Sequence, residues 1–334
     1  MKAVAMVGWS GAGRFEDIER TVVGKLSARE GDVDRIGDAL LVTADDPVAV
    51  ARSLTFLPGI SWIAVGYRFS GAGNYLKHLE LLARRYLSKG RTFKISAQVV
   101  ASKETAGDAV LSGNSVLLAS IPGVRVDERR PYVRFHVCIE GVTGACGAEI
   151  RAGPGGVPTR GDWVSCLVSG GERSSALAWM AARSGFSLRL VHSRTDEAAL
   201  RRVARLYSEL SFRMDPRCLE LVLLDGGDKP YGRIGGWLRD HKGPAFSGLR
   251  PGRPSALTEF AERFPNLALP LLLVQEDEVA AVYRSLRLGR AAQASGGREM
   301  TLKSLDALNP YAERRFGGVQ ADSNAVIDAM KRRG

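Results

Sequence analysis

The sequence predicts an α+β amino-terminal half followed by an α/β domain with a mostly parallel sheet. Strand-like and helix-like stretches alternate along the chain, and a segment with four glycines and two prolines, residues 151–161, interrupts them. The strands beyond this segment are continuously apolar, which is typical of parallel sheets covered by helices on both faces. A chain of 334 residues has room for two or three domains.

Residues 1–72 have the element order of a small ferredoxin-like sandwich. Ile18, Val22 and Leu26 lie four apart and predict a helix over residues 15–26. Pro47 opens a second, shorter helix, because proline fits best in the first turn. Strands are predicted at residues 3–8, 38–44 and 60–67. This β-α-β-α-β order indicates α+β architecture.

Residues 73–158 form a second α+β part. Leu79, Leu82 and Tyr86 lie on one face of a helix predicted over about 74–87. A further helix is predicted near 104–118, with strands at 92–100, 132–140 and 144–150. We place a domain boundary at the glycine-rich segment, after residue 158.

Residues 159–290 restart the alternation as an α/β domain. Leu200, Val203, Tyr207 and Leu210 follow the helical period and predict the strongest helix of the chain, over 196–212. The other predicted elements are strands at 163–169, 187–192, 219–225 and 267–274 and helices over 174–184 and around 278–286. The remaining residues, 291–334, are polar and basic, and we expect a tail that contributes little core.

Charge favours a polyanionic partner. The net charge is +11, of which residues 1–160 contribute +5 and the rest +6, so the basic excess is spread along the chain. Nucleic acid is the expected partner, and a basic surface without a partner is the alternative. Cys138 and Cys166 lie in apolar runs and are expected to be buried, and no CxxC pair or metal-ligand spacing occurs. This favours a reducing, cytoplasmic setting, and no apolar run reaches membrane-spanning length.

Several segments, in order, resemble one known family. They are similar to a THUMP domain joined to a PP-loop ATP pyrophosphatase domain, the layout of the tRNA 4-thiouridine synthases, which are also annotated for thiamine biosynthesis. The segments are "RTFKISAQVVASKETAGDAVLSGNSVL" (91–117), "VDERRPYVRFHVCIE" (126–140), "GPGGVPTRGDWVSCLVSGG" (153–171), "VHSRTDEAALRRVARLYSEL" (191–210), "HKGPAFSG" (241–248) and "LALPLLLVQEDEVAAVYRSLRLG" (267–289). The resemblance implies a THUMP domain at 73–158 and a PP-loop domain at 159–290.

The resemblance also implies partners and chemistry. In this family the amino-terminal part and the THUMP domain bind tRNA near its acceptor end. The PP-loop domain uses ATP and Mg²⁺ to adenylate uridine, and a cysteine persulfide, loaded by a sulfur-donor protein, supplies sulfur. Family positions that contact the nucleotide match Val168, Ser169, Gly170, Gly171, Ser174, His192 and Gly243. A His at the end of a strand without any special role is an equally good interpretation of His192.

The catalytic positions depart from the family pattern. The loop pattern is Ser-Gly-Gly-x-Asp-Ser, in which the glycines let backbone N–H groups approach phosphate and the Asp suits Mg²⁺. Here Arg173 stands at the Asp position, and Glu172, its neighbour, points in a different direction from a helix start. The family's cysteine after the third strand is missing, since Cys218 precedes that strand, and Gly248 replaces a nucleotide-contacting Gln. Arg173→Asp is therefore expected to strengthen Mg·ATP binding.

The residues expected to bind tRNA depart less from the family pattern. Basic side chains in the THUMP-like part can contact phosphates and give salt-dependent affinity, without any base code. A solvated charged surface is the alternative interpretation. The candidate RNA-binding residues are Arg91, Lys94, Lys103, Arg125, Arg129 and Arg130.

Three functions remain open on the sequence. The first is an active ATP-dependent tRNA thiolation enzyme. The second is a tRNA-binding relative whose adenylation site is altered or lost, which three departures at one site favour. The third is a nucleotide-binding protein without RNA, which leaves the THUMP-like half unexplained.

Overall fold

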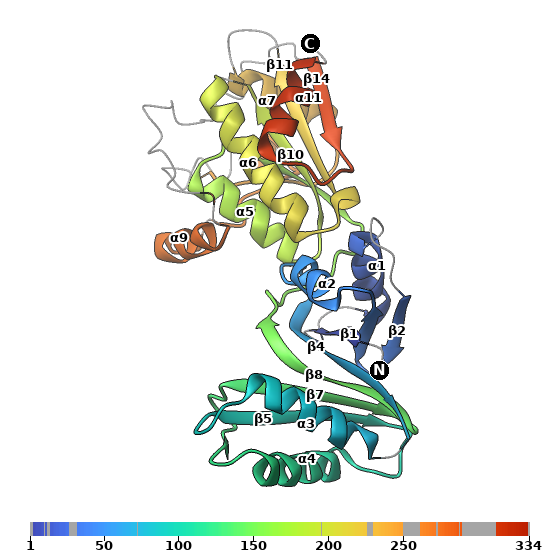
Figure 1. The fold of residues 1–334 in the computed structure, drawn as a ribbon. Coiled ribbons are helices and arrows are strands. Elements are labelled where there is room, and N and C mark those ends of the chain that lie inside the picture. Colours follow the sequence, from blue (N-terminus) through green and yellow to red (C-terminus); the bar gives the residue numbers. More distant parts are fainter. Residues whose placement is uncertain are drawn as a thin grey trace. The chain divides into compact units, whose positions relative to one another are not determined.

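The structure is a computed structural model, and it separates into two compact units, residues 1–158 and 159–334. Each unit is built around its own sheet (Figure 1). The residues that the structure describes are 3–9, 11, 14–26, 32–71, 73–194, 196–225, 230–249, 261–271, 273–286, 288 and 312–332.

Unit 1 contains an eight-stranded sheet in the order β2-β3-β1-β4-β8-β7-β5-β6. Most pairs are antiparallel, whereas β5 runs parallel to both β6 and β7. Its elements are β1 (Ala3–Trp9), α1 (Phe15–Leu26), β2 (Asp32–Ile36), β3 (Ala39–Thr43), α2 (Pro47–Leu54), β4 (Ile60–Ser70), α3 (Asn74–Tyr86), β5 (Thr92–Val100), α4 (Ala106–Ser120), β6 (Arg125–Val126), β7 (Val133–Glu140) and β8 (Thr143–Ala152).

Local sequence signals fix the starts of two helices in unit 1. Asp46 accepts a hydrogen bond from the N–H of Ala49 at 2.9 Å and caps α2, which begins at Pro47. Thr105 and Asp108 form a reciprocal capping box at the start of α4. Such caps give N–H groups the acceptors that a helix lacks in its first turn.

The sheet of unit 1 has cores on both faces. One apolar cluster packs α1 and α2 on β1, β3 and β4, and a second packs α3 and α4 on β5, β7 and β8. A third cluster, with Met6, Leu41 and Cys138, joins strands from both ends of the sheet on the other face. Gln98 of β5 bonds both the N–H and the carboxylate of Asp38, at 3.0 and 2.7 Å. The sheet therefore curves so that β5 approaches the turn between β2 and β3.

Unit 2 contains a six-stranded sheet in the order β13-β12-β9-β10-β11-β14. The first five strands are parallel, as predicted, and β14 is antiparallel to β11. Its elements are β9 (Trp163–Leu167), α5 (Glu172–Arg183), β10 (Ser187–Ser193), α6 (Glu197–Arg213), a 3₁₀ turn (Pro216–Cys218), β11 (Leu219–Asp225), α7 (Pro230–Asp240), β12 (Ala245–Ser247), β13 (Leu267–Ala268), α9 (Glu276–Ser285), β14 (Ala312–Gly317) and α11 (Ser323–Arg332).

Helices cover both faces of this parallel sheet, and the strands supply alternate residues to each side. Leu188 and Leu190 of β10 enter the cluster that packs against α6, whereas Val191 enters the one that contains Trp237 of α7. Figure 1 shows α5, α6 and α11 on one face and α7 on the other. This period of two explains why both faces of each strand are apolar in sequence.

The structure corrects the predicted tail. Residues 312–332 are part of the fold, because β14 pairs with β11 and α11 places Val326 and Ile327 in the core. Few residues of β14 are apolar, because it is the edge strand of the sheet. Its Phe316 packs on Tyr207, with 5.1 Å between the ring centroids. Residues 291–311 of the expected tail lie outside the described part of the chain.

Other predicted elements change in extent. The strand predicted at 267–274 is limited to Leu267–Ala268, because Pro270 cannot donate to a ladder and the chain turns there. Elements that the sequence did not predict include β2, which makes the order β-α-β-β-α-β in residues 3–70, and also β6, β12 and α7. Most of them are short, and short elements give weak periodic signals.

Candidate functional site

The Ser-Gly-Gly loop connects β9 to α5 at the carboxyl end of the parallel sheet. Val168 donates its N–H to the Val191 oxygen at 2.9 Å, which ties the loop to the neighbouring strand. Ser169 and Ser174 hold the loop closed: the Ser169 N–H donates to the Ser174 hydroxyl at 3.2 Å, and the two hydroxyls lie 3.3 Å apart. Ligands of parallel α/β sheets bind at this end, where loops gather.

The backbone requires glycine at only one of the two glycine positions of the loop. Gly170 has a φ of +77°, and a Cβ there would lie 2.5 Å from the Cβ of Arg202 on α6. Gly171 is the residue before α5, has a φ of −80°, and would place a Cβ 3.4 Å from the Ser169 hydroxyl. Only Gly170 therefore requires glycine for the fold. With no side-chain cap at Gly171, the first N–H groups of α5 are left for an anion.

Arg173 does not face the loop as a phosphate ligand in this structure. Its Nε donates to the Gly248 oxygen at 3.0 Å, one terminal nitrogen donates to the Leu271 oxygen at 2.9 Å, and the other pairs with the Glu276 carboxylate. The guanidinium thus joins the start of α5 to two later loops and to the start of α9. The residue that reverses the charge of the family pattern has a structural role here.

His192, at the end of β10, is buried beside the loop. Its Nδ1 lies 2.8 Å from the Val168 oxygen, so Nδ1 carries the proton and Nε2 is an acceptor. Burial lowers the pKa of His192 to about 4, so the ring is neutral at pH 7. Nε2 is buried without a hydrogen-bond partner among the described residues. An unpaired buried acceptor of this kind is suited to a ligand that donates a hydrogen bond.

Gly243, which the sequence assigns to the nucleotide, lies apart from this loop. It precedes β12, and the register of β12 with β9 puts Ala245 beside Ser165. Gly243 is therefore at the amino end of the parallel strands, whereas the loop is at their carboxyl end. Gly248, which follows β12, lies over the start of α5, where a Cβ would be 3.3 Å from the Ser174 nitrogen.

Three of the four cysteines lie in the cores of the two units. Cys138, Cys146 and Cys166 are buried, as expected for the first and last, and burial raises the pKa of the Cys166 thiol to about 12. Cys218 is half-buried beside the core of unit 2. No group of three His, Cys, Asp or Glu side chains that could hold a metal occurs among the described residues.

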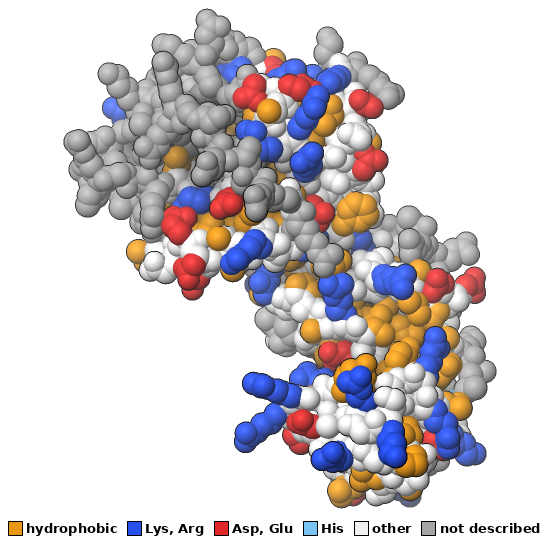
Figure 2. All heavy atoms as spheres, turned by 60° about the vertical axis from the view of Figure 1, so that its left-hand side comes forward, with side chains coloured by type: hydrophobic (Ala, Val, Ile, Leu, Met, Phe, Trp, Pro, Cys, Tyr) orange, Lys and Arg blue, Asp and Glu red, His pale blue; other side chains and the backbone are white. Residues whose placement is uncertain are grey.

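In unit 1, five of the six predicted RNA-binding residues gather at one end of the parallel strands, which we call the basic end. Arg91 precedes β5, Arg125 pairs in register with Thr92, and Arg129 and Arg130 follow in the loop before β7. Lys94, the fifth, lies on β5 two residues after Thr92, and its ammonium group pairs with the Glu128 carboxylate at 2.8 Å. Figure 2 shows Lys and Arg side chains standing out from the face of unit 1 turned to the viewer.

The loop of the basic end is ordered by Asp127. Its carboxylate accepts the N–H groups of Arg130 and Arg129, both at 2.9 Å, and these hydrogen bonds lower the pKa of Asp127. Its own N–H donates to the Phe93 oxygen at 2.9 Å, which fixes the loop to β5. Arg129 and Arg130 are exposed, so the loop presents two positive charges from a fixed backbone.

Lys103 is separated from the other five. It follows β5, whose nine residues span roughly 30 Å, so Lys103 lies at the opposite end of that strand. The sequence missed two further residues of the basic end: Arg134, opposite Lys94 in the β5–β7 register, and Tyr132, whose exposed ring lies under the Arg91 guanidinium at 4.1 Å. An exposed aromatic residue between basic ones is the signal that could have identified Tyr132.

Comparison with solved structures identifies the fold. A 4-thiouridine synthetase, solved as a complex with RNA and with bound ATP, matches with a TM-score of 0.68 and 16% identity over 99% of this chain and 94% of that one. PH1313 from Pyrococcus horikoshii Ot3 matches with a TM-score of 0.68 and 19% identity over 85% of this chain and 99% of that one. This chain has the fold of a 4-thiouridine synthetase. At these identities the likeness concerns the fold alone.

Sequence comparisons detect no relative. No protein-family model matches the chain, and no curated protein matches at a significant level. The likeness to the 4-thiouridine synthetase is therefore carried by two mixed α/β sheets and their order in the chain. Among the described helices, none has the length and apolar character needed to cross a bilayer.

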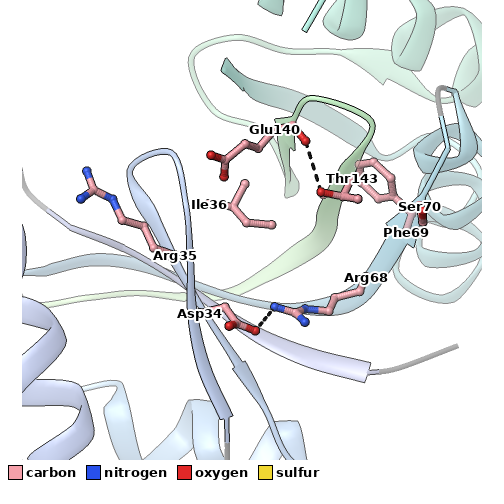
Figure 3. Close-up of a pocket in the computed structure, with 9 residues that line it drawn as sticks. Asp34, Arg35, Ile36, Arg68, Phe69, Ser70, Glu140 and Thr143 are labelled. Atoms are coloured by element: carbon pink, nitrogen blue, oxygen red, sulfur yellow. Dashed lines mark hydrogen bonds and ion pairs between the residues drawn. The ribbon is translucent and has the colours of Figure 1, made fainter. Parts of the chain in front are cut away.

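A pocket of about 540 Å³ lies elsewhere in unit 1, between β2, the end of β4 and the β7–β8 turn (Figure 3). Asp34 and Arg68 form an ion pair in it, and Thr143 donates to the Glu140 oxygen at 3.2 Å. Arg35 lies over the Phe15 ring, 3.9 Å from its centroid. The lining charges balance, with two arginines against two carboxylates, so this pocket lacks the basic excess of an RNA site.

Proposed function

We propose that this chain is a tRNA-binding protein related to the tRNA 4-thiouridine synthases, in which the adenylation site is altered or lost. The proposal assigns residues 1–72 as a ferredoxin-like domain, 73–158 as a THUMP domain and 159–290 as a PP-loop domain. The β-α-β-β-α-β order of residues 3–70 and the loop between β9 and α5 support this finer division. It acts in the cytoplasm, where its four thiols stay reduced.

The observation that carries the RNA part is the basic end of unit 1. Arg91, Arg125, Arg129 and Arg130 are exposed, and a loop held by Asp127 presents the last two. Arginines on a fixed backbone suit the phosphates of a folded RNA, which is recognised by shape more than by base sequence. A solved protein of the same fold was crystallised with RNA, which supports the same class of partner here. The acceptor-end region of tRNA is the proposed target.

The RNA part can be tested by binding of fluorescently labelled tRNA at several salt concentrations. We expect affinity to fall steeply with salt, and the triple variant Arg125→Ala/Arg129→Ala/Arg130→Ala to reduce the log–log slope by about 0.7–0.9 for each lost phosphate contact. Lys103→Ala, at the other end of β5, is the matched control and should leave the slope unchanged. A flat salt response of the wild-type protein would contradict the proposal, and an equal effect of Lys103→Ala would contradict the location.

The altered adenylation site is supported by Arg173. A carboxylate at this position could bind Mg²⁺, whereas the Arg173 guanidinium is held by Gly248, Leu271 and Glu276. Nucleotide binding itself remains part of the proposal. It is supported by the closed loop of Val168, Ser169, Gly170, Gly171 and Ser174 and by the bond of His192 to that loop.

The second candidate is an active thiolation enzyme that uses ATP and Mg²⁺ and receives sulfur from a donor protein. The intact Ser-Gly-Gly loop and neutral His192 favour it. Incubation with tRNA, Mg²⁺ and labelled ATP separates the two functions. Pyrophosphate release that depends on tRNA would establish the active enzyme, and its absence with tRNA binding intact would support the altered site.

A further inference from the structure

Arg202 is a cationic residue of α6 that packs on the Ser-Gly-Gly loop. It lies on α6, half-buried, and its Cβ is the atom that a Cβ on Gly170 would meet at 2.5 Å. Neither an ion pair nor a hydrogen bond of its side chain occurs within the described part of the chain, whereas its neighbour Arg201 pairs with Glu197 at 3.7 Å. A half-buried arginine without a carboxylate is costly unless it meets an anion.

The charge of Arg202 acts on His192 of β10 and on Tyr283 of α9. Its positive charge contributes to lowering the pKa of His192 and acts against the rise in the pKa of Tyr283. The Glu172 charge also acts on Tyr283, so the start of α5 and the Arg202 side chain share one neighbour. Arg202 therefore packs on Gly170 of the loop and lies near enough to the buried imidazole of His192 for its charge to act on it.

His192 provides the second, independent sign of a ligand. It is 3% exposed, and its Nε2 has no partner among the described residues, while Nδ1 donates to the first residue of the loop. An unprotonated Nε2 accepts a hydrogen bond and cannot donate one to a phosphate oxygen. The site therefore suits a ligand with both an anionic group and a hydrogen-bond donor. A nucleotide has both, because its phosphates are joined to a ribose and a base that carry hydroxyl and amino groups.

We propose that Arg202 supplies the positive charge that binds a nucleotide's phosphates at this loop, so that the site takes its nucleotide without a divalent cation. This inference rests on the nucleotide site proposed above. It adds that the nucleotide binds without a divalent cation and that Arg202 makes this possible. Where the resembled family has an Asp suited to the metal, this chain has Arg173, which cannot ligate a metal and whose guanidinium is bonded to protein groups. Arginine binds phosphate oxygens in pairs and needs no metal to do so.

The test measures ATP binding to the full chain by calorimetry in two buffers, one with Mg²⁺ and one with EDTA. We expect the wild-type Kd to be equal in the two buffers within about threefold. Arg202→Gln should weaken binding roughly 10- to 100-fold in both, the range for losing a charged hydrogen bond. Arg201→Gln removes the same charge one position away, on the exposed side of α6, and should change Kd less than about twofold.

The outcomes separate this inference from the proposed function. Glutamine keeps the Cβ that packs on Gly170. Unfolding curves of both variants check that they are folded. If Arg202→Gln is unfolded, Arg202→Lys keeps the charge and should bind ATP with intermediate affinity. ATP binding that requires Mg²⁺, or that Arg202→Gln leaves intact, overturns the inference and leaves the nucleotide site standing. No ATP binding in either buffer removes both the nucleotide site and this inference, while tRNA binding is measured separately.

Discussion

The Nε of Arg173 donates a 3.0 Å hydrogen bond to the backbone oxygen of Gly248, although the two residues are 75 positions apart. The same guanidinium reaches Leu271 and Glu276. One side chain thus fastens the start of α5 to the loop after β12 and to the segment before α9. Arg173 therefore holds together the elements around the Ser-Gly-Gly loop.

Arg173→Ala should destabilise the protein. The variant leaves two backbone oxygens and the Glu276 carboxylate without this donor, and we expect the free energy of unfolding to fall by roughly 2–4 kcal/mol. Urea unfolding followed by circular dichroism measures it. Arg201→Ala, which breaks only an exposed pair on α6, should cost less than about 1 kcal/mol. Equal losses for the two variants would show that the three contacts of Arg173 contribute no net stability.

Arg173→Asp needs a companion change to be informative. The sequence predicts that this variant gains Mg·ATP affinity, but the substitution also replaces the positive partner of Glu276 by a negative charge. The double variant Arg173→Asp/Glu276→Gln removes that like charge, so it should unfold at a higher urea concentration than Arg173→Asp. Titration of the double variant with ATP, with and without Mg²⁺, then measures whether the carboxylate restores metal dependence.

Gly170 and Gly171 should respond differently to alanine. Gly170→Ala requires a left-handed alanine and a contact of 2.5 Å with Arg202, so we expect a loss of roughly 2–4 kcal/mol in the free energy of unfolding. Gly171→Ala has an ordinary φ and a 3.4 Å contact, and should cost less than about 1 kcal/mol. Thermal unfolding of the pair checks this, and a tolerant Gly170 would mean that the loop packs less closely on α6.

His192 should make stability depend on pH. Its folded pKa of about 4 lies below the ordinary value of 6.5, so protons bind the unfolded chain preferentially between these pH values. Stability from the buried neutral ring is complete above pH 6.5 and is lost as pH falls towards 4, by on the order of 3 kcal/mol in total. In His192→Asn, urea unfolding at several pH values should show a shallower dependence over this window. Parallel curves for wild type and variant would contradict the assignment.

The last helix should contribute to the core. Val326 is fully buried, and Val326→Ala should lower the free energy of unfolding by roughly 2 kcal/mol. Val319→Ala is the matched control, because Val319 is 49% exposed and the same truncation there should change stability by less than about 0.5 kcal/mol. Chemical denaturation of both variants decides whether α11 is part of the cooperative unit.

Periodic, apolar elements could be predicted from the sequence. Helix α6 and the parallel strands β9, β10 and β11 follow from spacing alone, because burial of one stripe or of two faces leaves a regular pattern. The resemblance to 4-thiouridine synthases correctly predicted a fold that the solved 4-thiouridine synthetase shares. Strand β14 was missed because an edge strand needs few apolar residues, and Phe316 alone gives no period.

The candidate site was predictable only in part. The Ser-Gly-Gly loop is local in sequence, so its position after a buried strand could be recognised. The partners of Arg173 are 75, 98 and 103 residues away, and no local pattern indicates where its guanidinium lies. Gly243 was placed at the loop because it belongs to the right segment, but the strand direction puts it at the wrong end. Arg202 was missed because its role depends on contact between α6 and Gly170.

The antiparallel pairing of β14 with β11 has a consequence for synthesis of the chain. Every strand of the first sheet is complete once residue 152 has been made, so unit 1 can fold while translation continues. The second sheet receives its last strand only with residues 312–317, and until then one edge of β11 has no partner. The nascent protein therefore passes through a stage in which unit 1 has all of its strands while the sheet of unit 2 still has an open edge at β11.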